Sequence, residues 1–246
     1  MDDAVIIDAI AYLNNLFHGN SGGHEAAHSL RVYHNAMQIA ERETGCDLTI
    51  VALAALLHDV DDYKLFNTVN NFNARFFLES KHFDSAEIES ICQAINSVSF
   101  SKNRDRNPDT IEGMVVKDAD RLDAIGAVGI ARTFAYGGEH GRSMEMSIQH
   151  FYDKLLLLKS EMNTDSVRNI ASSRHAFMEL FLKEFQAETS ALSVFQTSDR
   201  SREEKNHQLF MKQRALLEMF LEHGAISKEQ FERSLHDLSD KMCEHQ

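Results

Sequence analysis

Two histidines and several aspartates carry most of the chemistry that this sequence could perform. His28 lies in the segment GGHEAAHSLRV, and His58 and Asp59 directly follow the apolar run of residues 50–57. Because that run is apolar on all sides of a helix, it predicts a buried helix that carries His58 and Asp59 inward. An ionised carboxylate is costly to bury unless it is paired or bound to a metal. For the His-Asp pair alone, a structural histidine beside a helix-ending aspartate is the alternative.

A second set of carboxylates lies in the segment VVKDADRLDAIGAVGIA, residues 115–131. A helical wheel places Asp123 on the inward face and Asp120 beside it, whereas Lys117 and Arg121 point away. Like charges this close raise each other's pKa unless a cation intervenes. Imidazole and carboxylate ligands suit Mn²⁺, Fe²⁺, Co²⁺, Ni²⁺ or Zn²⁺. The residues therefore predict a metal centre with positions open to water, which is typical of hydrolytic sites.

The ordered set H…HD…D resembles the signature of the HD-domain metal-dependent phosphohydrolases. The segments GGHEAAHSLRV, ALLHDVDDYKLF, KDADRLDAIG and HFYDKLLLLKSEMNT are together similar to the small stand-alone bacterial branch of that superfamily. The resemblance covers about residues 20–190 and implies an all-α fold. It also implies one divalent metal (Mn, Fe, Co, Ni, Zn or Mg, with Mn favoured), held by His28, His58, Asp59 and Asp120.

Neighbouring residues have supporting roles in this interpretation. With Asp120 as the ligand, Asp123 is expected to support a ligand from behind or to pair with a buried donor. Asp61 and Tyr63 are expected to lie in a solvated turn. His82 is the only histidine between the HD pair and Asp120, which favours one metal over two.

The resemblance also suggests which residues act on substrate. Asp62 lies four residues after His58, so it shares the metal-facing side if the helix continues. In related HD enzymes an acidic residue at that offset positions or deprotonates the attacking water, and Asp62 is therefore the predicted general base. The alternative is a carboxylate of the last turn in solvent. Arg31 and Lys64 are predicted to bind substrate phosphate through charge-assisted hydrogen bonds. Lys64 is also predicted to be a catalytic group.

The implied reaction is attack of a metal-activated water on phosphorus. Nucleotides are the favoured substrates, with a nucleoside triphosphate pyrophosphohydrolase as the first expectation. The second expectation is a 5′-nucleotidase or a cyclic nucleotide phosphodiesterase. From another class, a non-catalytic regulator could bind a nucleotide or a partner protein on the HD scaffold. The sequence contains no Walker loop or dinucleotide-binding fingerprint.

The amino-acid composition limits which molecules this protein can bind. Among 246 residues, 38 are Asp or Glu and 25 are Lys or Arg, which gives a net charge of −13. Such a chain lacks the basic surface of a general nucleic-acid binder, and it is repelled by an acidic membrane surface. Three widely spaced cysteines predict free thiols in a reducing cytoplasm. We expect a cytoplasmic protein whose partner is a small phosphorylated molecule, not a nucleic-acid polymer or a membrane.

Helical periodicity extends along nearly the whole chain, which contains a single proline and 11 glycines. We predict an all-α, HD-type globular domain over residues 1–195 and a C-terminal helical hairpin over 196–246. The hairpin turns at Gly224 and could pack on the main body or on a second chain in a homodimer. Helix starts are indicated by a D-x-x-E box at Asp84, an S-x-x-Q box at Ser227 and Asn107 before Pro108. The predicted helices span about residues 3–17, 24–43, 48–60, 68–80, 85–98, 110–135, 144–162, 165–190, 202–223 and 228–243.

Overall fold

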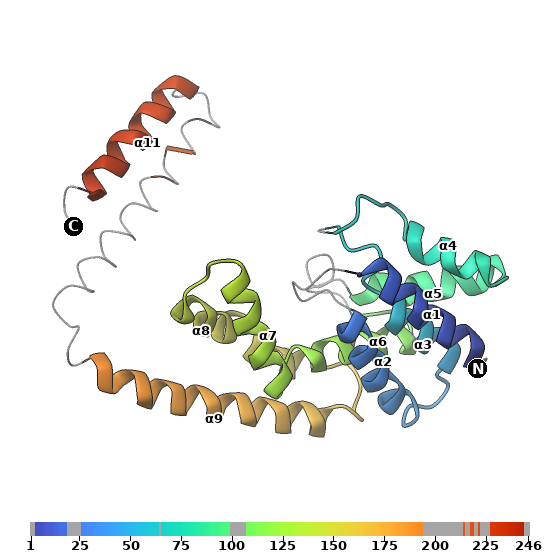
Figure 1. Cartoon of the computed structure of the whole chain (residues 1–246). Coiled ribbons are helices and arrows are strands. Elements are labelled where there is room, and N and C mark those ends of the chain that lie inside the picture. Colours follow the sequence, from blue (N-terminus) through green and yellow to red (C-terminus); the bar gives the residue numbers. More distant parts are fainter. Residues whose placement is uncertain are drawn as a thin grey trace. The chain divides into compact units, whose positions relative to one another are not determined.

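The computed structural model shows a chain built from helices (Figure 1). Within the described residues every regular element is helical, so the predicted all-α fold is confirmed. None of these helices is both long enough and apolar enough to cross a membrane. The structure describes residues 3–18, 26–63, 65–98, 107–193 and 227–243, together with Arg214, Leu217, Glu218 and Leu221.

The chain divides into two compact units, Met1–Leu182 and Lys183–Gln246. The HD domain boundary that we place near residue 195 stays a prediction. In the second unit, α11 (Lys228–Cys243) begins with the predicted capping box at Ser227. The helices of the first unit are α1 (Asp3–Leu16), α2 (Ala26–Ala40), α3 (Leu48–Leu57), α4 (Phe72–Ser80), α5 (Ser85–Val98), α6 (Ile111–Asp123), α7 (Gly126–Glu139), α8 (Met144–Asp153), the 3₁₀ helix η1 (Leu155–Glu161) and α9 (Arg168–Ser193), which ends in the second unit.

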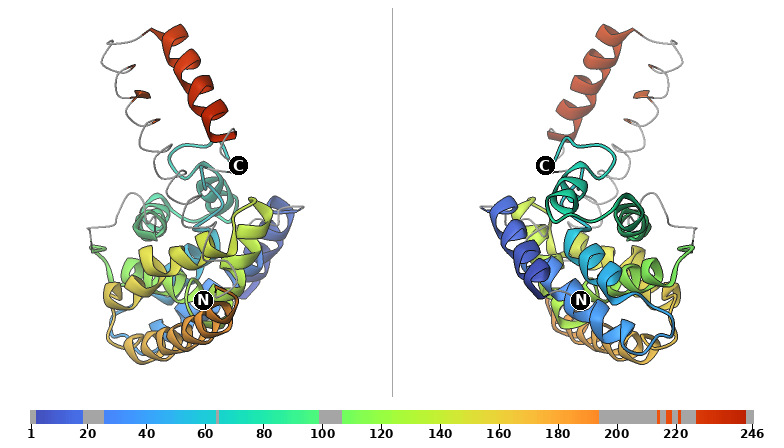
Figure 2. Two further views of the ribbon diagram at one scale, coloured as in Figure 1. Left: turned by 90° about the vertical axis from the view of Figure 1, so that its left-hand side faces the viewer. Right: turned by 90° about the vertical axis from the view of Figure 1, so that its right-hand side faces the viewer.

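Helix α3 is the centre of the core. Every residue from Val51 to Leu57 is completely buried, as its uniformly apolar sequence predicts. Helices α1, α2, α5 and α6 all pack against it (Figure 1 and Figure 2). Asp47 begins the helix by accepting hydrogen bonds from the N–H groups of Thr49 and Ile50 at 2.8 and 3.2 Å. The C-terminal end of α3 therefore delivers His58 and Asp59 among other helices.

The segment predicted as one helix over residues 110–135 forms two helices. α6 ends at Asp123, and Gly126 has a φ of +77°, in the left-handed region that glycine adopts most easily. A Cβ atom on Gly129 would collide with the backbone carbonyl of Ala124. A glycine at this position lets α7 begin very close to the end of α6. The prediction of a single helix is wrong, because the apolar residues keep the helical period on both sides of the break between Asp123 and Gly126.

Other helix boundaries also differ from the predictions. α3 ends at Leu57 instead of residue 60, and α4 begins at Phe72 instead of residue 68. The predicted helix over 144–162 breaks at Lys154 into α8 and η1. Thr110, not Asn107, caps α6 by accepting from the N–H of Gly113 at 3.1 Å. The capping box at Asp84 is confirmed by reciprocal hydrogen bonds with Glu87.

The turn after α3 is held by Asp61, so the expectation of a merely solvated turn carboxylate is wrong. Its two oxygens accept hydrogen bonds from the N–H groups of Asn73 and Ala74 at 2.9 and 3.0 Å. The N-cap residue of α4, Asn71, makes no side-chain capping hydrogen bond. Asp61 therefore caps α4 from 12 residues away along the chain. A local sequence pattern cannot indicate a cap at that separation.

The side of α6 that carries Asp118 and Arg121 is covered by the chain around residues 161–164. Asp118 is completely buried and accepts hydrogen bonds from the N–H groups of Asn163 and Thr164 at 2.9 and 2.7 Å. Arg121 donates to the backbone and the carboxylate of Glu161. The prediction that Lys117 and Arg121 point away from the core is wrong, because they are only 3% and 6% exposed.

Replacing Asp118 with alanine should lower the free energy of unfolding by about 3 kcal/mol, because buried N–H groups lose their acceptor. Chemical denaturation at one pH measures the difference. Asp165 offers a control from the same region, since its side chain is 93% exposed. Asp165→Ala should change the free energy of unfolding by less than about 0.5 kcal/mol. Equal effects of the two substitutions would contradict the structural role of Asp118.

Candidate metal centre

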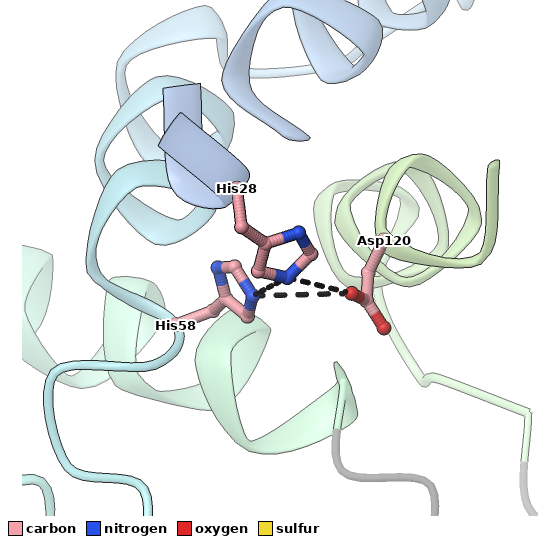
Figure 3. Close-up of side chains that lie close together, drawn as sticks. All are labelled: His28, His58 and Asp120. Carbon is pink, nitrogen blue, oxygen red and sulfur yellow. Dashed lines mark hydrogen bonds and ion pairs between the residues drawn. The ribbon is translucent and has the colours of Figure 1, made fainter. Parts of the chain in front are cut away.

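Three helices bring His28, His58 and Asp120 together (Figure 3). His28 lies near the start of α2, His58 caps the C-terminus of α3, and Asp120 lies in α6. The Nε2 atom of His28 is 3.3 Å from both the Nε2 atom of His58 and the Oδ1 atom of Asp120. His58 Nε2 and Asp120 Oδ1 are 3.9 Å apart. The three side chains therefore point their ligand atoms at one another.

Asp59 adds a second carboxylate to this cluster. Its Oδ2 atom is 3.6 Å from His28 Nε2, and its Oδ1 atom is 3.4 Å from His58 Nε2. The residue is only 9% exposed. The structure thus brings together all four residues that the sequence suggests as metal ligands, from positions up to 92 residues apart in the chain.

The hydrogen bonds behind the two histidines orient their rings. His58 Nδ1 lies 2.9 Å from the backbone carbonyl of Ala55, and His28 Nδ1 lies 2.7 Å from Oδ2 of Asp123. A carbonyl and a carboxylate only accept hydrogen bonds, so each Nδ1 carries the N–H. A neutral imidazole has one N–H, which leaves a lone pair on each Nε2. This is the ring orientation that metal-binding histidines adopt.

The cluster fits one divalent cation. The Nε2 atoms of two imidazoles and the oxygens of two carboxylates converge, and a cation among them would balance the two negative charges. Around an ion with bonds of about 2.1 Å, neighbouring ligand atoms lie about 3.0–3.4 Å apart. The observed separations of 3.3, 3.3, 3.4, 3.6 and 3.9 Å are close to those values.

The electrostatics of the cluster also favours positive charge. Burial lowers the pKa of His28, but hydrogen bonds to Asp120 and Asp123 and the charge of Asp59 outweigh burial and raise this pKa to about 9. For Asp120, burial and the contact with His28 change the pKa in opposite directions, and the net effect is a lower pKa. Burial raises its pKa, and the hydrogen bond and charge of His28 bring the pKa below its ordinary value.

Arg31, predicted to bind phosphate, forms a two-point ion pair with Asp123. Its Nε atom donates to Oδ1 at 2.7 Å and its Nη2 atom to Oδ2 at 3.1 Å. Asp123 is 1% exposed, and it contacts His28 from behind, as expected of a residue that supports a ligand. The assignment of Arg31 to substrate phosphate stays a prediction.

The structure does not place Asp62 on a continued α3. The helix ends at Leu57, and the chain proceeds through turns in which Asp62 N–H donates to the carbonyl of Asp59 at 3.0 Å. Because α3 does not continue to Asp62, the four-residue spacing from His58 does not place Asp62 on the metal-facing side of a helix. The role of Asp62 as general base stays a prediction. Lys64 lies outside the described residues.

Arg132, in the middle of α7, is a residue of this site that the sequence interpretation missed. Its Nη1 atom is 2.6 Å from Oδ2 of Asp123 and 3.1 Å from Nδ1 of His28. The available signal was the pair of glycines, Gly126 and Gly129, at which a helix can stop and restart. Such an interruption changes the direction of the helix and lets Arg132 contact the end of α6.

Comparison with known proteins identifies the family. The HD domain model matches residues 26–125, which include all four clustered residues. The chain is 38% identical over 192 residues to the uncharacterized protein YpgQ of Bacillus subtilis (strain 168), covering 74% of this chain and 93% of YpgQ. The chain belongs to the HD-domain family.

Solved structures of HD relatives match the same part of the fold. The crystal structure of B. subtilis YpgQ in complex with ADP has a TM-score of 0.65 at 36% identity, covering 74% of this chain and 97% of that one. An HD-superfamily hydrolase from Bacillus thuringiensis has a TM-score of 0.65 at 37% identity, covering 77% and 98%. The prediction of an HD-superfamily metal-dependent phosphohydrolase is confirmed.

Removing one imidazole from the HD pair should abolish metal binding. We expect about one Mn²⁺ per chain in the wild type and less than about 0.1 in His58→Ala, because the remaining ligands hold the ion too weakly. Elemental analysis after gel filtration with Mn²⁺ measures this. His34, an exposed histidine of α2, provides the matched control. Retention of the metal in His58→Ala, or its loss in His34→Ala, would contradict the assignment.

Proposed function

We propose that this HD-family protein is a divalent-metal-dependent nucleotide phosphohydrolase that converts nucleoside triphosphates to monophosphates and pyrophosphate. The observation that carries the proposal is the cluster of His28, His58, Asp59 and Asp120, in which two imidazole Nε2 atoms and two carboxylates converge within 3.3–3.9 Å of one another. The relative YpgQ was crystallised in complex with ADP, and this supports the choice of a nucleotide as substrate.

In the proposed reaction the metal and the protein residues have separate roles. When bound, a divalent ion supplies Lewis acidity for a water molecule and for the phosphoryl oxygens. The oxygen of water forms a bond to the α-phosphorus, and the bond from that phosphorus to the bridging oxygen breaks. Pyrophosphate leaves with the bridging oxygen. His28 and His58 take no proton in this scheme, because their Nε2 atoms serve as ligands.

Three further residues have proposed roles in the reaction. Asp62 accepts the proton of the attacking water as general base. It is partly buried, and its N–H is hydrogen-bonded to the carbonyl of Asp59, so it follows a metal ligand by a single turn. Arg31 and Lys64 bind phosphate oxygens, with Lys64 also offsetting the negative charge that develops on them.

Hydrolysis of nucleoside triphosphates in the presence of Mn²⁺ tests the proposed activity. The wild type should release a nucleoside monophosphate and pyrophosphate, and Asp59→Asn should lower kcat at least about 100-fold because the metal is lost. Anion-exchange chromatography separates the products. The exposed Asp165→Asn is the matched control and should keep full activity.

The products also separate this proposal from other activities. Release of orthophosphate with a diphosphate, or of a free nucleoside from a monophosphate, would replace the pyrophosphohydrolase with a different phosphatase. No hydrolysis of any nucleotide with Mn²⁺, Mg²⁺, Co²⁺ or Ni²⁺ would favour a binding protein over an enzyme.

The role of Asp62 has its own test. Asp62→Asn should lower kcat about 100-fold or more and leave the Mn²⁺ content and KM near the wild-type values, because only proton transfer is affected. Steady-state kinetics with the Mn²⁺-loaded protein measures both constants. Full activity of Asp62→Asn would assign the base to another group, and loss of Mn²⁺ would make Asp62 a ligand.

A further inference from the structure

We propose that Arg132 is a positioning residue: together with Arg31 it holds Asp123 against Nδ1 of His28 and so keeps the Nε2 lone pair of His28 directed at the metal. This inference rests on the metal site of the proposed function, but it does not depend on the identity of the substrate.

The carboxylate of Asp123 accepts four contacts from three side chains. Its Oδ2 atom is 2.7 Å from His28 Nδ1, 2.6 Å from Arg132 Nη1 and 3.1 Å from Arg31 Nη2. Its Oδ1 atom is 2.7 Å from Arg31 Nε. The Asp123 side chain is 2% exposed, so a carboxylate that is almost sealed from water is compensated by two guanidinium groups.

The two arginines constrain this carboxylate in different ways. Arg31 contacts both oxygens through a planar fork, which fixes the plane of the carboxylate. Arg132 contacts only Oδ2, the oxygen that His28 also uses. Arg132 therefore holds the acceptor of the His28 N–H in place. Without it, Oδ2 keeps only the 3.1 Å contact from Arg31, and the acceptor of the His28 N–H is held less firmly.

The junction between α6 and α7 brings Arg132 into contact with Asp123. Asp123 is the last residue of α6, and the helix is interrupted before Gly126, which begins α7 with a φ of +77°. The absence of a Cβ atom at Gly129 lets α7 start against the backbone of Ala124. Arg132 follows Gly129 by three residues, close to one helical turn. The close α6–α7 junction and the contact of Arg132 with Asp123 thus belong to one local structure.

A positioning role differs measurably from a substrate contact. A side chain that only binds nucleotide phosphate changes KM and leaves the affinity for metal alone unchanged. A side chain that orients a metal ligand from behind changes metal affinity in the absence of any nucleotide, typically 10–100-fold.

The experiment is titration of metal-free, full-length protein with Mn²⁺ by calorimetry, without nucleotide. Arg132→Gln should raise the dissociation constant for Mn²⁺ about 10-fold or more, with circular dichroism showing an intact fold. Arg132→Lys keeps a cationic donor for Oδ2 and should recover most of that affinity. Arg75→Gln is the control, because Arg75 also pairs with a carboxylate, that of Glu89 at 2.7 and 2.9 Å, and this variant should bind Mn²⁺ like the wild type.

Each other outcome has a definite meaning. Wild-type affinity in a folded Arg132→Gln overturns the inference and leaves the proposed function standing. If Arg132→Gln does not fold, Arg31→Gln tests the same carboxylate from its other side, and unchanged Mn²⁺ affinity there overturns the inference equally. A wild type that binds no Mn²⁺ overturns both the metal site of the proposed function and this inference.

Discussion

The convergence of two imidazoles and two carboxylates between helices α2, α3 and α6 is the constraint on which this structure depends. The Nε2 atoms of His28 and His58 approach to 3.3 Å while their N–H groups point outward to Asp123 and Ala55. Two carboxylates lie against the same nitrogens, and positive charge among them, from a bound cation or from protonation of His28, compensates their burial. α3 carries half of the cluster because its apolar sequence buries it in the core, with its C-terminal end toward α2 and α6.

Helix α6 shows how one short segment serves several parts of this arrangement. Asp118 fixes the chain at Asn163 and Thr164, Asp120 faces the two histidines, and Asp123 supports His28 from behind. Asp123 also connects the centre to α7 through Arg132. The three aspartates look alike in sequence, yet each has a different set of neighbours. Their separation by two and three residues distributes them around the helix, so that structural and metal-binding roles do not compete.

The placement of His58 and Asp59 beside other helices was predictable from sequence, because a uniformly apolar helix carries them inward. Capping boxes were predictable since their partners lie three residues apart. The contacts of Asp61 with the start of α4 and of Arg132 with Asp123 were not predictable, because they depend on where the chain turns and where helices are interrupted, as before Gly126. A helical wheel likewise could not show which side of α6 is covered, and it misplaced Arg121.

The central claim is that one divalent ion is held by His28, His58, Asp59 and Asp120. Diffraction at the manganese absorption edge, from crystals grown with Mn²⁺, tests it most directly. The account predicts a single anomalous peak among these four side chains, within about 2.3 Å of both Nε2 atoms and of an oxygen of each carboxylate. A map with no peak there, or with a peak that lacks contact with either histidine, would contradict it.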